Sequence, residues 1–357
     1  MSPLSHATIA AGEIGLRGKQ HPWTITPPDF FAGTADLRGL AASIMGATPA
    51  DIALVPSASY GIAVAAANLP LQRGQEVLVL AEAFPSMVYA WQEAARTAGA
   101  TMVTVPRPSD DDWTSAVLMH ITDRTAVASL PQCHWTDGGL LDLVAIGTRL
   151  RAVGGALVVD ATQSLGAMPL DVSIIQPDFL VAAGYKWLLG PYSLGYLYAA
   201  PHRQHGRPLE HNWISREGSE DFAGLTRYRD TLQTGARRYD VGETSNFILV
   251  PMAIAALTEL LTWGVGAVQA TVSSLAEQIA RDAEPIGLHA VPRARRAGHY
   301  LGLRSATPLP ASLVQHLAAA KIYVSVRGQA LRVTPHLYNT TEDGARLVAV
   351  LREVLQA

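Results

Sequence analysis

The most informative part of the sequence is residues 156–191, ALVVDATQSLGAMPLDVSIIQPDFLVAAGYKWLLGP. It contains two apolar runs that are typical of buried strands. The first run ends in the carboxylate of Asp160, and the second leads into Lys186. Only three lysines occur in the whole chain, and Lys186 lies among apolar residues in a run closed by Gly190-Pro191.

Lys186 is therefore the first candidate for chemistry. A charged amine in apolar surroundings is costly unless it is paired or used, and desolvation lowers its pKa and makes it a nucleophile. A lysine at the end of a strand can also extend its amine into solvent, which is the structural alternative. Asp160 at the neighbouring strand end favours the chemical interpretation. A carboxylate that holds a pyridine nitrogen protonated and a lysine that forms a Schiff base are what pyridoxal 5'-phosphate requires.

Strand-like and helix-like segments alternate from about residue 50 to 200. The segments 75–84, 101–108 and 125–135 are expected strands, and 87–100 and 140–155 are expected helices. This alternation predicts an α/β fold with a mainly parallel sheet, in which ligands bind at the carboxyl ends of the strands.

A second, smaller α+β domain is expected at the C-terminus. Residues 20–248 are predicted to form the large cofactor-binding domain. Residues 249–357, together with the N-terminal segment 1–19, are predicted to form the small domain. In it, 298–305 and 321–340 are expected to contain strands and 341–356 a helix.

Composition narrows the function classes. The chain has 357 residues, 49% hydrophobic and 16% charged, with a net charge of −3 and no basic block, so nucleic-acid binding is not expected. Cys133 is the only cysteine, which excludes an intrachain disulfide. No histidine motif for a metal, signal peptide or membrane-spanning run is recognisable, and a cytoplasmic location is expected.

Two further segments are candidates for cofactor contacts. Ser57, Ala58 and Ser59 begin a helix after a strand, where free N–H groups and hydroxyls can hold a phosphate. A plain serine N-cap is the alternative. Phe84 follows another strand and can stack on a flat ring, although it can equally be a core residue at a turn.

The remaining candidates for cofactor and substrate contacts are polar residues. Gln163 can donate to the cofactor's ring hydroxyl, and Tyr185 can reach a phosphate oxygen, although either can instead be a satisfied buried polar group. Arg332 lies in an apolar run, where its guanidinium suits a substrate carboxylate or, alternatively, an ion pair between domains. Arg327 is a weaker candidate for the same role.

From about Ser57 onward, the chain resembles the class V aminotransferase family of fold-type I pyridoxal phosphate enzymes. The family includes cysteine desulfurases, selenocysteine lyases, kynureninase and isopenicillin N epimerase. The most specific resemblance lies in VVDATQSLG and DFLVAAGYKWLLGPYSLGYLY, and AFPSMVYAW is similar to the kynureninase and epimerase branch. The resemblance implies a homodimer with shared active sites, in which Thr244 contributes to the partner's phosphate site and Arg332 binds the substrate α-carboxylate.

Two departures from the family pattern bear on the chemistry. Many relatives have Ser or Thr shortly before the lysine, whereas this chain has Ala182-Ala183-Gly184-Tyr185, so Tyr185 and Ser59 are expected to hold more of the phosphate. Desulfurases use a cysteine shortly before the arginine strand, and none occurs here. Cys133 is expected to be an inert buried thiol.

The predicted activity is Cβ elimination from an amino acid, of the C–S lyase type, without a persulfide cysteine. Transamination and epimerisation are the alternatives, because they begin from the same carbanion. A fold retained as a binding module without turnover is a further alternative, which the Lys186 and Asp160 pair disfavours. A nucleotide-dependent dehydrogenase is disfavoured because no glycine-rich fingerprint is present.

Overall fold

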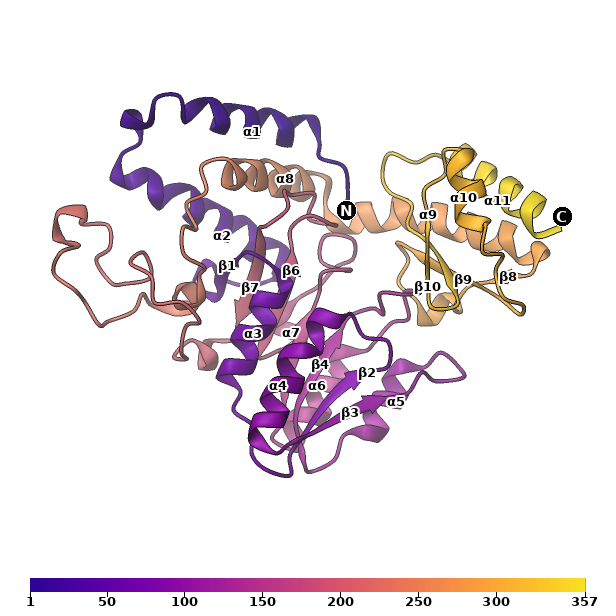
Figure 1. Ribbon diagram of the computed structural model, residues 1–357, viewed down its shortest axis with the longest axis horizontal. Helices are drawn as coiled ribbons and strands as arrows, with labels where there is room; N and C mark the ends of the chain where they lie inside the picture. The colour runs from indigo at the N-terminus through magenta and orange to yellow at the C-terminus, as the bar shows by residue number, and fades with distance from the viewer. Residues whose placement is uncertain (357) are drawn as a thin grey trace.

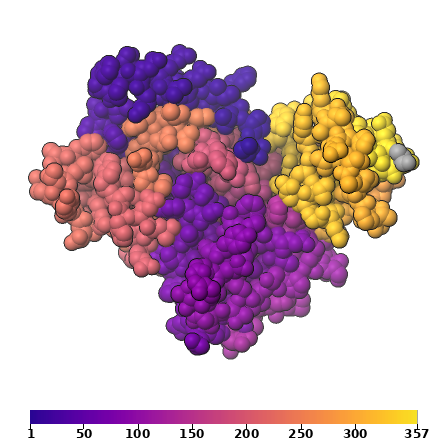
Figure 2. Space-filling view, in the orientation of Figure 1, coloured from indigo at the N-terminus to yellow at the C-terminus, as the bar shows by residue number. Residues whose placement is uncertain are grey.

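The computed structural model describes residues 1–356 and shows a large domain with a smaller C-terminal domain beside it (Figure 1). Helix α1 crosses the top of the large domain in the same view, and the space-filling view shows the small domain standing to one side (Figure 2).

The large domain is built on a seven-stranded sheet of order β1-β7-β6-β5-β4-β2-β3. Its strands are β1 (Ile52–Val55), β2 (Glu76–Leu80), β3 (Thr101–Val105), β4 (Thr125–Pro131), β5 (Ala156–Asp160), β6 (Phe179–Ala183) and β7 (Gly195–Ala199). Only β7 runs antiparallel to its neighbours within this sheet. Strands β1, β2, β5, β6 and β7 are buried along their whole length, as expected where helices cover both faces. The predicted α/β class with a mainly parallel sheet is confirmed.

Helices pack on both faces of this sheet, because alternate residues of each strand point to opposite sides. The helices of this domain are α1 (His6–Gly18), α2 (Ala32–Met45), α3 (Ala58–Asn68), α4 (Tyr89–Ala98), α5 (Trp113–His120), α6 (Leu143–Ala152), α7 (Val172–Ile175) and α8 (Leu249–Trp263). Helices α3 and α4 share one hydrophobic core with the sheet, and α2, α5, α6, α7 and α8 share the other. A Cβ on Gly61 of α3 would lie 2.5 Å from Val181 of β6, so glycine lets this helix approach the sheet closely.

The small domain is a four-stranded antiparallel sheet of order β10-β11-β9-β8. Its elements are β8 (Leu288–His289), β9 (Leu301–Ser305), α10 (Leu313–Ala319), β10 (Ser325–Arg327), β11 (Ala330–Val333) and α11 (Thr341–Gln356), with α9 (Val265–Ala283) leading into it. Leucines and valines on one face of the sheet form a separate core with α9, α10 and α11.

The division between the two cores lies within α9. Val268 belongs to the core of the large sheet, whereas Leu275, two turns later, belongs to the core of the small domain. The sequence-based division placed α8 and residues 1–19 in the second domain. In the structure, α8 buries Val250, Ala253, Leu257 and Leu260 in the core of the large sheet, and α1 packs on α8. A predominantly apolar helix is accommodated where it can be covered on both sides, which the large domain provides.

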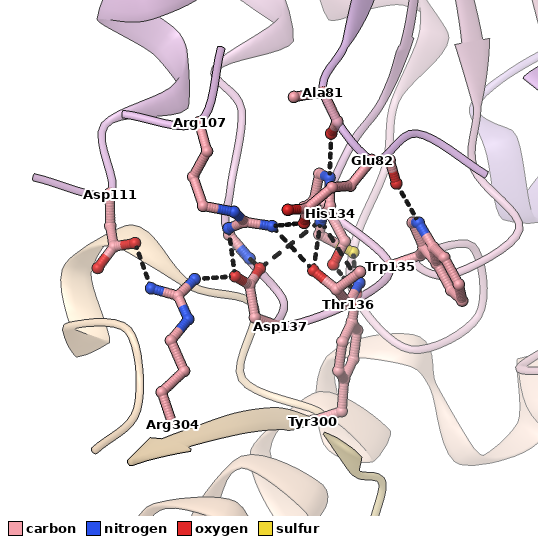
Figure 3. A network of polar contacts seen from close by, with 12 residues as sticks. Ala81, Glu82, Arg107, Asp111, His134, Trp135, Thr136, Asp137, Tyr300 and Arg304 are labelled. Carbon is pink, nitrogen blue, oxygen red and sulfur yellow. Dashed lines mark hydrogen bonds and ion pairs between the residues drawn. The ribbon is translucent and has the colours of Figure 1, made fainter. Parts of the chain in front are cut away.

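A network of charged residues joins the two domains (Figure 3). Asp137, after β4, accepts hydrogen bonds from Arg107 of the large domain, at 2.5 Å, and from Arg304 of β9. Arg304 also donates to Asp111 at 3.0 Å. The face of the small sheet that carries Arg304 is therefore held toward the large domain.

Within residues 1–356, no single helix is long and apolar enough to cross a membrane. Helices α8 and α9 meet the criteria of length and apolar composition only as a pair, and the pair is bent by 76°.

Candidate active site

The loops that follow β1, β2, β4, β5 and β6 converge at the carboxyl edge of the large sheet. They enclose a cavity of about 840 Å³, a volume that includes its open mouth. The lining side chains include Ser57, Ala58, Ser59, Phe84, Asp160, Gln163, Tyr185 and Lys186. The structure thus brings together eight of the eleven candidate residues named from the sequence, all except Thr244, Arg327 and Arg332.

Lys186 lies in a tightly held turn three residues beyond the end of β6. The Gly184 N–H donates to the Leu194 carbonyl at 2.8 Å, and the Gly190 N–H donates to the Gly184 carbonyl at 2.9 Å. The Lys186 Nζ lies 5.7 Å from the centre of the Phe84 ring. Burial lowers the pKa of Lys186 to about 8, although the nearby carboxylate of Asp160 acts in the opposite direction.

This lowered pKa predicts how the apoprotein takes up pyridoxal phosphate. Only the neutral amine attacks an aldehyde, so the rate of uptake should rise with pH and level off above a midpoint near pH 8. Stopped-flow absorbance over a pH series measures the midpoint. A midpoint close to about 10.4, the ordinary lysine value, would contradict the burial seen here.

Asp160 is the last residue of β5 and is paired in register with Pro131 of β4 and Val181 of β6. Its Oδ1 accepts a hydrogen bond from the Thr162 N–H at 2.9 Å. Burial raises the pKa of Asp160, while Thr162 and the charge of Lys186 lower it. A buried carboxyl that lacks a guanidinium partner suits a ligand that brings its own positive charge, such as a protonated ring nitrogen.

The opposite end of the cavity is the N-terminus of α3. Ser57 is the N-cap, and its hydroxyl accepts a hydrogen bond from the Tyr60 N–H at 3.2 Å. Ser59 donates to Ser86 at 2.9 Å, and both hydroxyls face the cavity. The helix N–H groups and these hydroxyls form a site suited to a phosphate. Ser86 was missed from the sequence, because only the fold brings it to α3.

Aromatic side chains line the wall between these ends. Phe84 and Trp135 meet edge to face with centroids 5.5 Å apart, and the Trp135 indole donates to the Glu82 carbonyl at 2.6 Å. The ring centroids of Tyr185 and Tyr192 lie 4.5 Å apart. Burial raises the pKa of Tyr185, so its hydroxyl stays protonated and able to donate a hydrogen bond. Trp135 was also missed, although an aromatic residue just beyond β4 was the available signal.

Gln163 and Arg332 connect the small domain to the cavity. The Arg332 guanidinium donates from Nη2 to the Gln163 side-chain oxygen at 3.2 Å, and its buried Nε has no partner. The fully buried His299 contacts the Gln163 carbonyl through Nε2 at 2.5 Å. Arg332 does not itself line the cavity but lies behind Gln163, which does, and its Nε has capacity for a further acceptor. The Gln163 amide remains free to donate. His299 was missed from the sequence.

Cys133 lines the cavity but is 1% exposed. Burial raises the pKa of its thiol to about 12. A thiol that stays protonated is a poor nucleophile.

Thr244 does not line the cavity of its own chain. It is buried two residues after Gly242. The Gly242 N–H donates to the Glu210 carboxylate at 2.7 Å. Its role in the site of a second subunit stays a prediction.

The residues present fit pyridoxal phosphate. An amine of lowered pKa, a buried carboxyl and a helix N-terminus with free hydroxyls lie around one cavity, in positions suited to an aldehyde, a ring nitrogen and a phosphate. The fold and the site together define a pyridoxal phosphate enzyme of fold type I.

Comparison with known proteins identifies the family. The aminotransferase class-V profile matches residues 29–346, and the chain belongs to this family. The uncharacterized aminotransferase YcbU of Bacillus subtilis is 30% identical over 85% of this chain and 78% of its own length. An isopenicillin N epimerase of Amycolatopsis lactamdurans is 25% identical over 98% of this chain and 89% of its own.

A solved structure shares the fold. C-DES, described as a cystine C–S lyase in complex with its product cysteine persulfide, superposes with a TM-score of 0.89 at 21% identity, over 98% of this chain and 95% of its own.

Proposed function

We propose that the protein catalyses β-elimination from an α-amino acid, of the C–S lyase type, and that no cysteine of the chain carries sulfur. The observation that carries the proposal is the place of the only cysteine. Cys133 is enclosed, hydrogen-bonded to the Tyr300 hydroxyl at 3.7 Å, and held as a thiol. The similarity of fold to C-DES is consistent with this chemistry.

The residues divide the work between binding and proton transfer. When bound, pyridoxal phosphate withdraws electrons from the α-carbon of an attached amino acid. The Asp160 carboxylate stabilises positive charge on the ring nitrogen, and the hydroxyls beside α3 hold the phosphate. Arg332, which has no carboxylate partner of its own, binds the α-carboxylate, and Lys186, with its pKa near 8, moves the proton at the α-carbon.

Products test this proposal directly. For a cysteine thioether, loss of the α-proton and cleavage of the Cβ–S bond release a thiol, and water converts the remaining three carbons to pyruvate and ammonia. We expect pyruvate, ammonia and thiol in equal amounts from the holoenzyme. Cys133→Ala should keep this turnover, whereas loss of turnover in a folded Cys133→Ala protein would contradict the proposal.

Transamination is the second candidate, favoured by the 30% identity to YcbU, which is described as an aminotransferase. It would require a 2-oxo acid acceptor and would return a new amino acid instead of ammonia. An epimerase would return the same amino acid with inverted configuration. One set of product measurements distinguishes the three reactions.

A homodimer is part of the proposal. Thr244 would then contribute to the phosphate site of the partner subunit, as the family resemblance implies. Sedimentation of the holoenzyme measures the assembly, and a cytoplasmic location stays a prediction.

A further inference from the structure

Three arginines lie on the face of the small-domain sheet that is directed toward the large domain. In the pairing of β10 with β11, Ser325 lies opposite Arg332, so their side chains share a face. Arg327, two residues after Ser325, lies on that same face. In the pairing of β11 with β9, Gly302 lies opposite Arg332, which places Arg304 on it as well.

The opposite face of the sheet is apolar. Leu301, Leu303, Leu331 and Val333 belong to the core of the small domain. The three arginines therefore all face the large domain.

These arginines differ in what neutralises them. Arg304 pairs with Asp111, at 3.0 Å, and with Asp137. Within residues 1–356, neither Arg327 nor Arg332 forms an ion pair. Arg332 has the neutral Gln163, and Arg327 donates only to the adjacent Val326 carbonyl, at 2.9 Å.

Arg327 lies next to Trp135, a residue that lines the cavity. Its guanidinium lies 5.7 Å from the centre of the Trp135 ring, and Trp135 contacts Phe84, which in turn lies over Lys186. Diagonal neighbours on paired strands have Cβ atoms roughly 7–8 Å apart, so Arg327 and Arg332 can hold two ends of one small molecule. The two guanidiniums carry like charges and repel each other, and an anion bound between them relieves the repulsion.

We propose that Arg327 forms a second anion subsite, and that the substrate is an α-amino acid whose side chain ends in a carboxylate. Arg332 binds the α-carboxylate and Arg327 binds the distal one. This inference rests on the proposed function for the reaction but not for the binding, because the two arginines bind a dicarboxylate whether or not it reacts.

Binding of an unreactive ligand separates the two questions. Succinate has no amine, and its monoamide, succinamate, has nearly the same shape with one charge fewer. Calorimetry on the holoenzyme should show succinate binding about tenfold more tightly than succinamate. Arg327→Gln should abolish this preference, whereas Arg352→Gln, which removes an exposed charge from α11, should retain it. Arg332→Gln should weaken both ligands.

Equal affinities of the wild type for the two ligands would overturn the subsite, and so would a preference that survives Arg327→Gln. A matched substrate pair then tests specificity. S-carboxymethylcysteine should have a kcat/KM about tenfold above that of its amide in the wild type, and equal to it in Arg327→Gln. A further outcome is that neither compound yields pyruvate while the wild type, but not Arg327→Gln, still binds succinate more tightly than succinamate. In that case the proposed elimination reaction is wrong and the subsite stands.

Discussion

Replacing Lys186 by Ala is expected to lower kcat by about 10³-fold or more, because the change removes the amine that we propose both holds the cofactor aldehyde and acts as the base at the substrate α-carbon. Burial lowers the pKa of the Lys186 amine to about 8, so a large share of the amine is neutral near that pH. Steady-state kinetics with the most active substrate measures the loss. Absorbance spectra of the same protein should lack the visible band of the wild-type holoenzyme.

The matched control is Lys19→Ala, which removes a lysine from an exposed position after α1. Its kinetics and spectrum should equal those of the wild type. A Lys186→Ala protein that keeps the wild-type visible band would show that the cofactor aldehyde is held elsewhere. Retained turnover would remove Lys186 from the reaction.

The proximity of Asp160 and Lys186, the proposed catalytic pair, was predictable because it depends on local pattern and one general rule. Two apolar runs predict two buried strands, and parallel strands present their carboxyl ends at one edge of a sheet. Asp160 and Lys186 therefore had to lie near each other once β5 and β6 were recognised as neighbours, which their pairing confirms. The start of helix α3 was likewise predictable, because Ser57 is a typical N-cap residue directly after an apolar run.

Other parts of the site depend on contacts between distant segments. Ser86 reaches Ser59 only because α3 lies beside the loop after β2. His299 is 136 residues from the Gln163 carbonyl that it contacts, and nothing in its neighbourhood in the chain distinguishes it from a core histidine. The sequence also does not specify the register of β10 with β11, which places Arg327 and Arg332 on one face of the sheet.

The charged contact between domains had no recognisable signal, since Arg107, Asp137 and Arg304 are separated in sequence and each looks like a surface residue. In the structure Asp137 is 1% exposed. Burial alone would raise the pKa of Asp137, but the guanidiniums of Arg107 and Arg304 hold it below its ordinary value. A Cβ on Gly302 would lie 2.4 Å from the Asp137 Cβ, so β9 presses directly against this carboxylate.

Removing this carboxylate should produce the largest loss of stability. Asp137→Ala removes the buried carboxylate that the two arginines share, although Arg107 keeps Glu82 and Arg304 keeps Asp111. We expect a loss of about 3 kcal/mol of unfolding free energy, the lower end of the range for a broken buried pair. Urea unfolding at pH 7 measures the loss. Glu93→Gln, which breaks an exposed pair with Arg96, is the control and should leave the urea midpoint unchanged.

The pH dependence gives this prediction a sign. Because the folded-state pKa of Asp137 is depressed, its contribution is present above the unfolded value of about 3.9 and disappears as pH falls through the lower folded value. The difference in unfolding free energy between wild type and Asp137→Asn should therefore shrink in acid. The substitution should also raise KM more than it lowers kcat, since the small domain that carries Arg332 loses its fixed position over the cavity. Equal urea midpoints for wild type and Asp137→Ala would mean that the apolar contacts around α9, rather than this carboxylate, hold the two domains together.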